Sequence, residues 1–332
     1  MKAIVLEAAQ GLESAILKEQ PKPEPSAGEV RVALKAAALN HREIWIGKGQ
    51  YPGMKLPSIL GADGAGIVDA AGDGVDPSIV GSSVVLYPAL NWGSDHRFPS
   101  RDFCLLGMPV AGTLAEYICV PSANVFAKPD FLSFDEAAAL PTAGLTAYRA
   151  LATKARLQKG EKVLVTGIGG GVATFALVFA AAMGADVFVT SSSEDNIRHA
   201  SELGAKGGFN YREENWGKAA RAAAGGFDVV IDGAPAPSYS AYGRALNNGA
   251  RVVVYGSTGG VNIPVNAPEL FLRHAAILGT AMGSLDDFSA MIDFVAIHRI
   301  RPVIHDVFDI EVFDKAVAGL QGDHLGKIVV RL

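Results

Sequence analysis

The 332-residue chain is short of cysteine and of positive charge. Its two cysteines, Cys104 and Cys119, form at most one disulfide and cannot build a four-cysteine zinc lobe. We therefore expect a reducing compartment and no cysteine-rich metal site. The 29 lysines and arginines are outnumbered by 34 aspartates and glutamates, which gives a net charge of −5. Without a basic stripe for phosphate backbones, we expect no nucleic-acid partner.

Long apolar runs are also missing. No stretch reaches about 18 apolar residues without Gly, Pro or a charge, as a membrane-spanning helix would need. The most apolar tract, residues 175–189, is broken by Gly184 and Asp186. The opening residues MKAIVLEAA show no apolar segment followed by a small-residue cleavage site. We expect a cytoplasmic protein that does not enter the membrane.

Apolar residues are plentiful in short runs, at 49% of the chain against 19% charged residues. This composition supplies large cores and excludes disorder as the dominant state. The length exceeds the roughly 250–300 residues at which a single core stops growing, so about two domains are expected.

The N-terminal third and the rest of the chain differ in how apolar residues and turn residues are spaced. Up to about residue 120, short apolar runs alternate with Pro, Gly and Ser clusters, which predicts a compact β-barrel-like domain. From about residue 133, short apolar runs alternate with helical patterns. The tail, residues 285–332, is too small for its own core and is expected to fold back onto the N-terminal domain.

The alternation in the middle of the chain predicts a doubly wound parallel sheet with helices on both faces. One of the intervening helices is expected over residues 239–246. The predicted strands are VLVT (163–166), DVFVT (186–190), GGFNY (207–211), FDVVIDGA (227–234), ARVVVYGS (250–257) and AILGTAM (276–282).

A glycine run lies between the first of these strands and an alanine-rich helix. Gly167, Gly170 and Ala173 fit a GxxGxxA spacing, with Gly169 and Gly171 beside them. A tight turn, a bare backbone and a helix N-terminus together bind the pyrophosphate of a dinucleotide. A purely structural turn is the alternative.

The end of the next strand decides between NAD and NADP(H). An acidic residue about 20 residues after the glycines would contact a free ribose 2′-hydroxyl. This chain has Ser191, Ser192 and Ser193 instead, which favours NADP(H). The alternative is that Ser191 and Glu194 form a helix capping box.

Several motifs together carry a family resemblance: AALNHREIWIGKGQYP, LPSILGADGAGIVDAAGDGV, GTLAEYICVP, EAAALPTAGLTAYRAL, the glycine loop, FDVVIDGA and GKIVV. On these motifs the chain resembles the medium-chain dehydrogenases/reductases, on their zinc-independent quinone oxidoreductase side. The resemblance implies an α/β fold with a GroES-like β-barrel catalytic domain (1–125 and 284–332) and a Rossmann NADP(H)-binding domain (126–283). It places the active site in the cleft.

The resemblance also bears on zinc. In the zinc alcohol dehydrogenases two catalytic ligands fall at positions that here hold Asn40 and Ala62, and the structural lobe contains only Cys104. Because zinc needs about four N, S or O ligands, we expect none at either site. His41, if it lies near Asp63, would keep a metal role open together with His96, although a hydrogen-bonded structural histidine is the commoner case.

The resemblance further implies site residues. Asn40 would lie near the nicotinamide and Thr146 beneath it, with His41 and Tyr148 as further catalytic candidates. Asn196 stands where related NADPH enzymes often have Lys, with Arg198 as a compensating group. Lys327 is expected to reach the cofactor or to cap the edge of its strand. The other cofactor residues are Gly167, Gly169, Gly170, Gly171, Val172, Ser191, Ser192, Ser193, Tyr211, Gly256, Ser257, Ala281 and Met282.

The sequence does not decide which group donates the proton or whether the loop 87–109 binds substrate. His41, Tyr51 and Tyr148 are chemically capable donors, and solvent is the alternative. The loop 87–109 carries Trp92, Phe98 and Phe103, which suit a flat apolar substrate. The same loop equally fits a lobe that packs on itself or on a neighbouring subunit. Tyr51 and Trp92 are the substrate candidates.

The resemblance favours an NADPH-dependent reductase of quinones or α,β-unsaturated carbonyls. A metal-free alcohol or ketone oxidoreductase and a non-catalytic NADPH-binding protein are the alternatives. The resemblance also implies a homodimer through the edge of the Rossmann sheet, with residues 261–274 as the contact strand region. Pro264 and Pro268 would protect that edge outside the dimer.

Overall fold

The computed structural model describes residues 1–332, which divide into two compact units. Unit 1 comprises Met1–Ala143 and Ser284–Leu332, and unit 2 comprises Gly144–Gly283. The sequence placed the first boundary after residue 125, which is too early. Helix α2 (Phe134–Ala139) packs on strands of unit 1, so the chain leaves this unit only after it.

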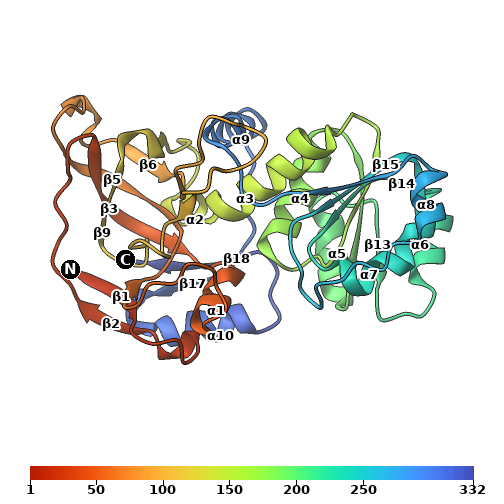
Figure 1. Cartoon of the computed structure of the whole chain (residues 1–332), viewed down its shortest axis with the longest axis horizontal. Coiled ribbons are helices and arrows are strands. Elements are labelled where there is room, and N and C mark those ends of the chain that lie inside the picture. The colour runs from red at the N-terminus through yellow and green to blue at the C-terminus, as the bar shows by residue number, and fades with distance from the viewer. The chain divides into compact units, whose positions relative to one another are not determined.

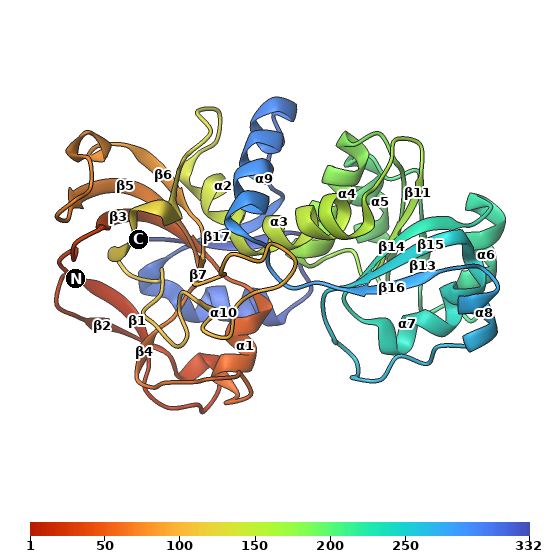
Figure 2. The same cartoon turned by 45° about the horizontal axis from the view of Figure 1, so that its top comes forward.

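Unit 2 is a six-stranded parallel sheet in the order β13-β12-β11-β14-β15-β16. The six apolar runs form these strands, which confirms the doubly wound fold, and the order is that of a dinucleotide-binding domain. Figure 2 shows α4 and α5 on one side of the sheet and α7 on the other. The strands are β11 (Lys162–Val165), β12 (Asp186–Ser191), β13 (Gly207–Asn210), β14 (Phe227–Asp232), β15 (Leu246–Val254) and β16 (Ala276–Gly279).

One helix of unit 2 lies earlier than expected. Helix α7 spans Pro235–Tyr242, not residues 239–246, and a single 3-10 turn (Gly243–Ala245) joins it to β15. Pro235 stands in the first helical turn, where a missing N–H and a fixed φ favour a helix start. The other helices of this unit are α4 (Gly171–Ala182), α5 (Glu194–Glu202), α6 (Trp216–Ala224) and α8 (Ala267–Phe271), and a π-helix (Arg149–Ala155) precedes β11.

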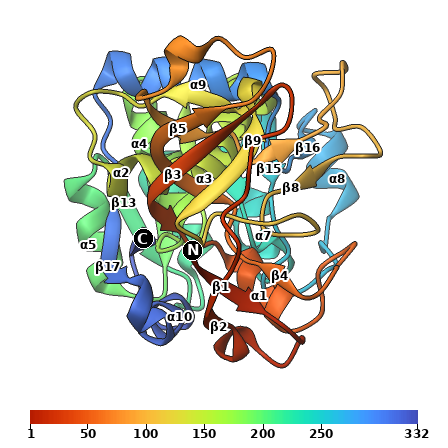
Figure 3. The same cartoon turned by 90° about the vertical axis from the view of Figure 1, so that its left-hand side faces the viewer.

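Unit 1 is built on a seven-stranded sheet in which β18 and β17, from the C-terminal tail, continue the path from β3 (Figure 1). The tail therefore folds back onto the N-terminal part, as expected. A three-stranded sheet of β1, β2 and β4 (Figure 3) and the antiparallel strand pair β7-β8 complete the unit. The strands are β1 (Lys2–Leu6), β2 (Ile16–Glu19), β3 (Glu29–Ala38), β4 (Ser58–Ile59), β5 (Asp63–Ala71), β6 (Ser83–Leu86), β7 (Ala89–Leu90), β8 (Cys104–Leu105), β9 (Tyr117–Pro121), β10 (Val125–Ala127), β17 (Ile304–Asp309) and β18 (Lys327–Arg331).

The helices of unit 1 are short except for α9. They are α1 (His41–Gly47), α2, α9 (Leu285–His298) and α10 (Phe313–Gln321), with 3-10 turns at Leu12–Ser14, Pro77–Ile79, Ser122–Asn124 and Ile310–Val312. Helix α3 (Pro141–Tyr148) crosses the first boundary between the units. No helix of the chain combines the length and the apolar character needed to cross a lipid bilayer.

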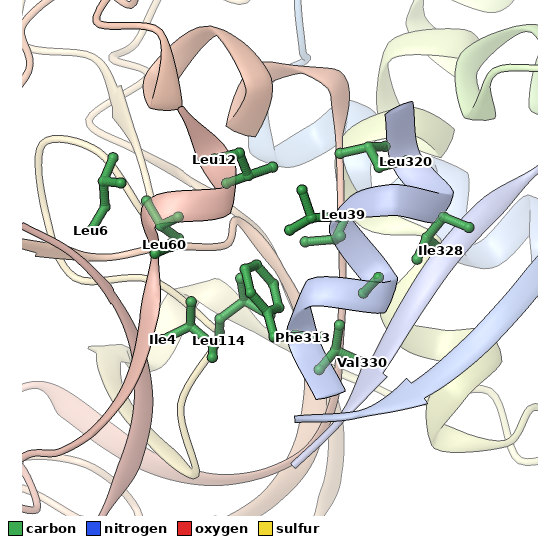
Figure 4. Close-up of a cluster of buried hydrophobic side chains, with 14 of the residues drawn as sticks. Ile4, Leu6, Leu12, Leu39, Leu60, Leu114, Phe313, Leu320, Ile328 and Val330 are labelled. Atoms are coloured by element: carbon green, nitrogen blue, oxygen red, sulfur yellow. The ribbon is translucent and has the colours of Figure 1, made fainter. Parts of the chain in front are cut away.

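A core in unit 1 anchors two residues that matter below. Leu39 and Ile328 are buried in a cluster with Phe313 of α10 and with side chains of β1 (Figure 4). Burying a side chain of this size contributes about 1.5–3 kcal/mol. The packing of Leu39 and Ile328 holds the backbone on which their chain neighbours, Asn40 and Lys327, stand.

Candidate functional site

The glycine loop in unit 2 presents bare backbone at a helix N-terminus. Gly167 has a φ of 66°, a region that side chains with a Cβ avoid. Gly170 caps α4 without any side-chain hydrogen bond to the first turn. A Cβ built on Gly167 or Gly170 would meet nothing within 4 Å. The open space and the uncapped helix fit an anionic pyrophosphate.

Side chains from neighbouring strands fix the start of this loop. The Gly167 N–H donates to Thr190 Oγ1 at 3.0 Å, and the Ile168 N–H donates to the Thr190 carbonyl at 2.7 Å. Thr166 Oγ1 donates to Asp232 Oδ1 at 2.6 Å. The loop is therefore held by β12 on one side and by β14 on the other.

Asp232 is fully buried and accepts four hydrogen bonds. Besides Thr166, its donors are the Ala234 N–H at 2.8 Å and the hydroxyls of Ser238 at 2.6 Å and Tyr242 at 2.8 Å. Burial, together with the charge of Asp232, raises the pKa of Tyr242 well above its usual value. Asp232 thus ties α7 to β11 through neutral donors.

The three serines after β12 have different partners. Ser193, not Ser191, caps α5, because its hydroxyl accepts the Asn196 N–H at 3.3 Å. Ser191 is buried, donates to the Ile168 carbonyl and accepts the Ser193 N–H. The capping box of Ser191 and Glu194 is therefore wrong. Ser192 alone of the three keeps a hydroxyl that the chain does not engage, on a partly exposed side chain.

Tyr211 and Glu194 lie beside these serines. The Tyr211 N–H donates to the Ser191 carbonyl at 3.0 Å, and its side chain is 46% exposed. Glu194 accepts a hydrogen bond from Asn210 Nδ2 at 2.8 Å, which turns its carboxylate toward β13. Arg198 pairs with Asp195 on the surface of α5.

In unit 1, strand register brings three polar residues together. Ala38, the last residue of β3, is paired with Asp63 on β5 and with Val329 on β18. The Leu39 N–H continues this ladder by donating to the Ile328 carbonyl at 2.9 Å. One residue further on, the same antiparallel register sets Asn40 opposite Lys327.

These residues form a buried network. Lys327 Nζ donates to Asn40 Oδ1 at 2.5 Å and to Asp63 Oδ2 at 3.0 Å. Asn40 Nδ2 donates to the same Asp63 oxygen at 2.9 Å, and the Thr142 N–H donates to Asp63 Oδ1 at 2.8 Å. The side chains of Lys327 and Asp63 are 3% and 0% exposed, whereas Asn40 is half-buried. Lys327 is thus committed to Asn40 and Asp63.

A second buried pair supports the start of α1. Glu43 Oε2 accepts the Asn40 N–H at 2.7 Å, and Glu43 Oε1 lies 3.3 Å from Arg42 Nη1. Burial raises the pKa of Glu43 and outweighs the opposing effect of Arg42. Arg42 also donates to the Leu106 carbonyl at 2.8 Å and from Nε to the Tyr51 hydroxyl at 3.3 Å. The hydroxyl of Tyr51 therefore has a fixed partner within the chain.

His41 contacts a residue of its own helix, α1. Its ring meets Trp45 edge-on, and burial, with the charges of His324 and Lys48, lowers its pKa. His96 pairs on the surface with Asp286, at 3.1 Å. The structure therefore does not bring His41, Asp63 and His96 together as a metal site.

Known proteins match the whole chain. The pattern of the zinc-binding dehydrogenases matches residues 171–296, and that of the alcohol dehydrogenase GroES-like domain matches residues 26–130. The zinc-type alcohol dehydrogenase-like protein YogA of Leptosphaeria maculans is 36% identical over 94% of this chain and 92% of its own length. The chain belongs to the medium-chain dehydrogenase/reductase superfamily.

Two further members of the superfamily differ in the activity their names give. A quinone oxidoreductase of Rattus norvegicus is 31% identical over 79% of this chain and 74% of its own length. A crystal structure of an NAD-dependent alcohol dehydrogenase superposes with a TM-score of 0.93 and 36% identity, and covers all of both chains. Membership therefore makes the protein an oxidoreductase. It does not determine the electron acceptor or the choice between NAD and NADP.

The superfamily includes zinc enzymes, but the residues of this chain do not fit a zinc ion. The two ligand positions hold an amide and Ala62, and the oxygens of Asn40 and Asp63 are both bonded to the ammonium of Lys327. A second cation on the same oxygens would meet like charge. No three His, Cys, Asp or Glu side chains of the 332 residues lie together as a metal-binding group.

The loop expected to bind substrate is a lobe with its own packing. Trp92 is 6% exposed, meets Phe103 edge-on and donates its indole N–H to the Asp95 carbonyl at 3.1 Å. Phe98 is 56% exposed and lies beside the Arg97 guanidinium. For Trp92 the structure thus favours the alternative of a lobe that packs on itself.

The remaining expected site residues lie in unit 2. Thr146 is buried in α3, and Tyr148 meets Phe179 of α4 edge-on. Gly256 and Ser257 follow β15, while Ala281 and Met282 follow β16, with Met282 at a φ of 57°. Gly171 and Val172 open α4, and Gly169 has a φ of 153°.

The sequence did not point to the residues that hold the glycine loop and Asn40 in place. Thr190 and Asp232 hold the glycine loop, and Glu43 and Asp63 surround Asn40, yet none was chosen as a site residue. The available signal was position: Asp232 and Thr190 stand at or near strand ends that border the loop. No comparable signal linked Asn40 to Lys327, which lie 287 residues apart.

Proposed function

We propose that this protein is an NADPH-dependent, zinc-independent reductase of quinones or α,β-unsaturated carbonyls. The observation that carries the proposal is that a lysine ammonium, not a metal, holds Asn40 in unit 1, while unit 2 separately offers an open glycine loop for a dinucleotide. The quinone oxidoreductase relative supports the choice of acceptor.

Unit 2 supplies the groups that bind the cofactor. The open backbone at Gly167 and Gly170 and the first turn of α4 would receive the pyrophosphate. Ser192 would donate to the 2′-phosphate, with Tyr211 beside it. The bound nicotinamide supplies the hydride.

Unit 1 supplies polarising groups in place of a Lewis acid. Asn40 is the member of its network that a ligand can reach, because Asp63 and Lys327 are buried behind it. An amide N–H at a carbonyl oxygen stabilises the charge that develops during hydride addition. Burial lowers the pKa of His41, which favours its neutral ring. In this proposal the proton comes from solvent or from a nearby side chain.

A panel of acceptors tests this function. Oxidation of NADPH and of NADH is followed at the nicotinamide absorbance with 1,4-benzoquinone, 2-cyclohexenone and cyclohexanone, after treatment with EDTA and metal analysis. We expect turnover with the quinone or the enone, a preference for NADPH, and no loss after EDTA. Turnover with cyclohexanone alone, a preference for NADH, or loss of activity together with stoichiometric zinc would contradict the proposal.

A metal-free alcohol or ketone oxidoreductase is the second candidate. It is favoured by the alcohol dehydrogenase structure that covers all of this chain. Cyclohexanone in the acceptor panel, and cyclohexanol with NAD or NADP in the reverse direction, distinguish it from the first.

We also propose that two copies of the chain pair through β16, one of the two edge strands of the unit 2 sheet. In the segment that precedes β16 in the chain, Val261, Phe271 and Leu272 are 83%, 62% and 69% exposed. Residues 267–271 form α8, so the expected contact strand is partly helical. In light scattering, Phe271→Glu/Leu272→Glu should halve the mass of a dimer. The control Ile297→Glu removes another exposed apolar side chain, in unit 1, and should leave the mass unchanged.

A further inference from the structure

The network around Asn40 fixes which end of its amide is a donor. A lysine ammonium only donates and a carboxylate only accepts. Lys327 Nζ lies 2.5 Å from Asn40 Oδ1, and Asp63 Oδ2 lies 2.9 Å from Asn40 Nδ2. Turning the amide over would place N–H against ammonium and oxygen against carboxylate, so only one orientation is stable.

One amide N–H of Asn40 has no partner within the chain. Its backbone N–H goes to Glu43, its Oδ1 accepts from Lys327, and one Nδ2–H goes to Asp63. The second Nδ2–H remains, on the one half-buried side chain of the network. Lys327 and Asp63 are shielded from solvent and reach a ligand only through this amide.

We propose that Lys327 is a positioning residue: it orients and polarises the Asn40 amide so that the second Nδ2–H donates to the carbonyl oxygen of the acceptor. This inference rests on the proposed function. A hydrogen bond from a charged donor to Oδ1 draws electron density from the amide and strengthens its remaining N–H.

The chemistry needs such a donor. In the proposed reaction the hydride, with its electron pair, forms a C–H bond at the β-carbon of the enone. The C=C π electrons move toward the carbonyl carbon and those of C=O move onto the oxygen, while the nicotinamide is oxidised. A proton from solvent completes the saturated product. A donor held at the oxygen before the hydride arrives needs no reorganisation as charge develops.

The test is a double-mutant cycle of Asn40→Ala and Lys327→Met, with kcat, KM and NADPH affinity measured separately. Removal of a direct donor costs about 100-fold or more in kcat. We expect Asn40→Ala to show such a loss and Lys327→Met a smaller one of about 10- to 100-fold. In the Asn40→Ala background Lys327→Met should add little. The affinity for NADPH should be unchanged in both single variants. Lys327→Arg, which keeps a cation, should have a higher kcat than Lys327→Met.

A charge-balanced variant separates positioning from folding. Lys327→Met leaves Asp63 buried and unpaired, whereas Asp63→Asn/Lys327→Met removes both charges and should regain thermal stability. We expect kcat to stay low in the double variant. Recovery of kcat there, a full further loss in the Asn40→Ala background, or weaker NADPH binding with normal kcat would overturn the inference.

An NMR readout does not depend on turnover. The Asn40 side-chain amide pair is assigned by its disappearance in Asn40→Asp, and Lys327→Met should shift both of its proton resonances. The control Lys315→Met removes an exposed lysine on α10 and should leave them in place. Unshifted resonances in Lys327→Met overturn the inference. Failure of wild type to reduce any enone or quinone, with the shift present, overturns the proposed function instead.

Discussion

Asp63 in unit 1 and Asp232 in unit 2 are both fully buried at strand ends, yet they are stabilised differently. Asp232 accepts four hydrogen bonds from neutral donors, three of them hydroxyls. Asp63 faces one cation, one amide and one backbone N–H. Asp232 fixes the glycine loop, to whose bare backbone we assign the pyrophosphate. Asp63 belongs to the network through which we propose that the Asn40 side chain acts.

The largest expected effect is the loss of folding stability when either of these two aspartates is replaced. Asp63→Ala leaves Lys327 buried without its counter-ion, and breaking a buried pair costs about 3–5 kcal/mol. Asp232→Ala orphans several donors at about 1–3 kcal/mol each before relaxation. Urea unfolding should show that Lys327→Met rescues Asp63→Asn, while Asp232→Asn is not rescued by removal of any cation. Equal behaviour of the two sites would refute the distinction.

The next effect concerns the backbone site. Gly170 has an ordinary φ of −70° and open space around a built Cβ, so a side chain there should cost little in folding. It would fill the space that we assign to the pyrophosphate. We expect Gly170→Leu to weaken NADPH binding about 100-fold, near 2.7 kcal/mol, with Gly170→Ala between it and wild type. Titration of NADPH fluorescence measures this, and unchanged affinity in Gly170→Leu would remove the loop from the site.

A smaller effect separates Ser192 from Ser193. An aspartate at Ser192 would repel a 2′-phosphate and accept from a free 2′-hydroxyl. Ser192→Asp should lower the preference for NADPH over NADH in kcat/KM about 10-fold, near 1.4 kcal/mol. Ser193→Ala loses the α5 cap at about 1 kcal/mol of stability and should leave the preference unchanged. The reverse pattern would place the 2′-phosphate on Ser193.

The smallest effect is the pH dependence that Glu43 contributes. Burial raises its pKa in the folded protein, so the folded state holds this proton more tightly than the unfolded state. Stability from this group is present below the unfolded value near 4.5 and falls as pH rises through the folded pKa. Glu43→Gln should remove this fall in stability between low and neutral pH. Urea unfolding at pH 4 and pH 7 measures it, and parallel profiles would contradict the raised pKa.

The sequence predicted unit 2 well because its signals are local. Strand, glycine turn and helix follow one another within residues 162–182, and each needs only its own neighbours to be recognised. The serines were harder, since Ser191, Ser192 and Ser193 are equivalent in the sequence. Only the buried position of Ser191 and the cap at Ser193 distinguish them.

The network of unit 1 could not be predicted in the same way. Asn40 was a candidate through family resemblance, but its partners come from β5 and β18, far away in the chain. For the loop near Trp92 the sequence left a substrate loop and a self-packed lobe equally open, and only the ring contact and the indole hydrogen bond favour the lobe.

By itself the sequence determined the two-part architecture, the parallel sheet and the place of the glycine loop, because hydrophobic periodicity and turn chemistry act over a few residues. Tertiary structure decided that Lys327 bonds Asn40 and Asp63, which of three serines stays open, and where unit 1 ends. These depend on antiparallel register and on burial, which arise only when distant segments pair and lose water.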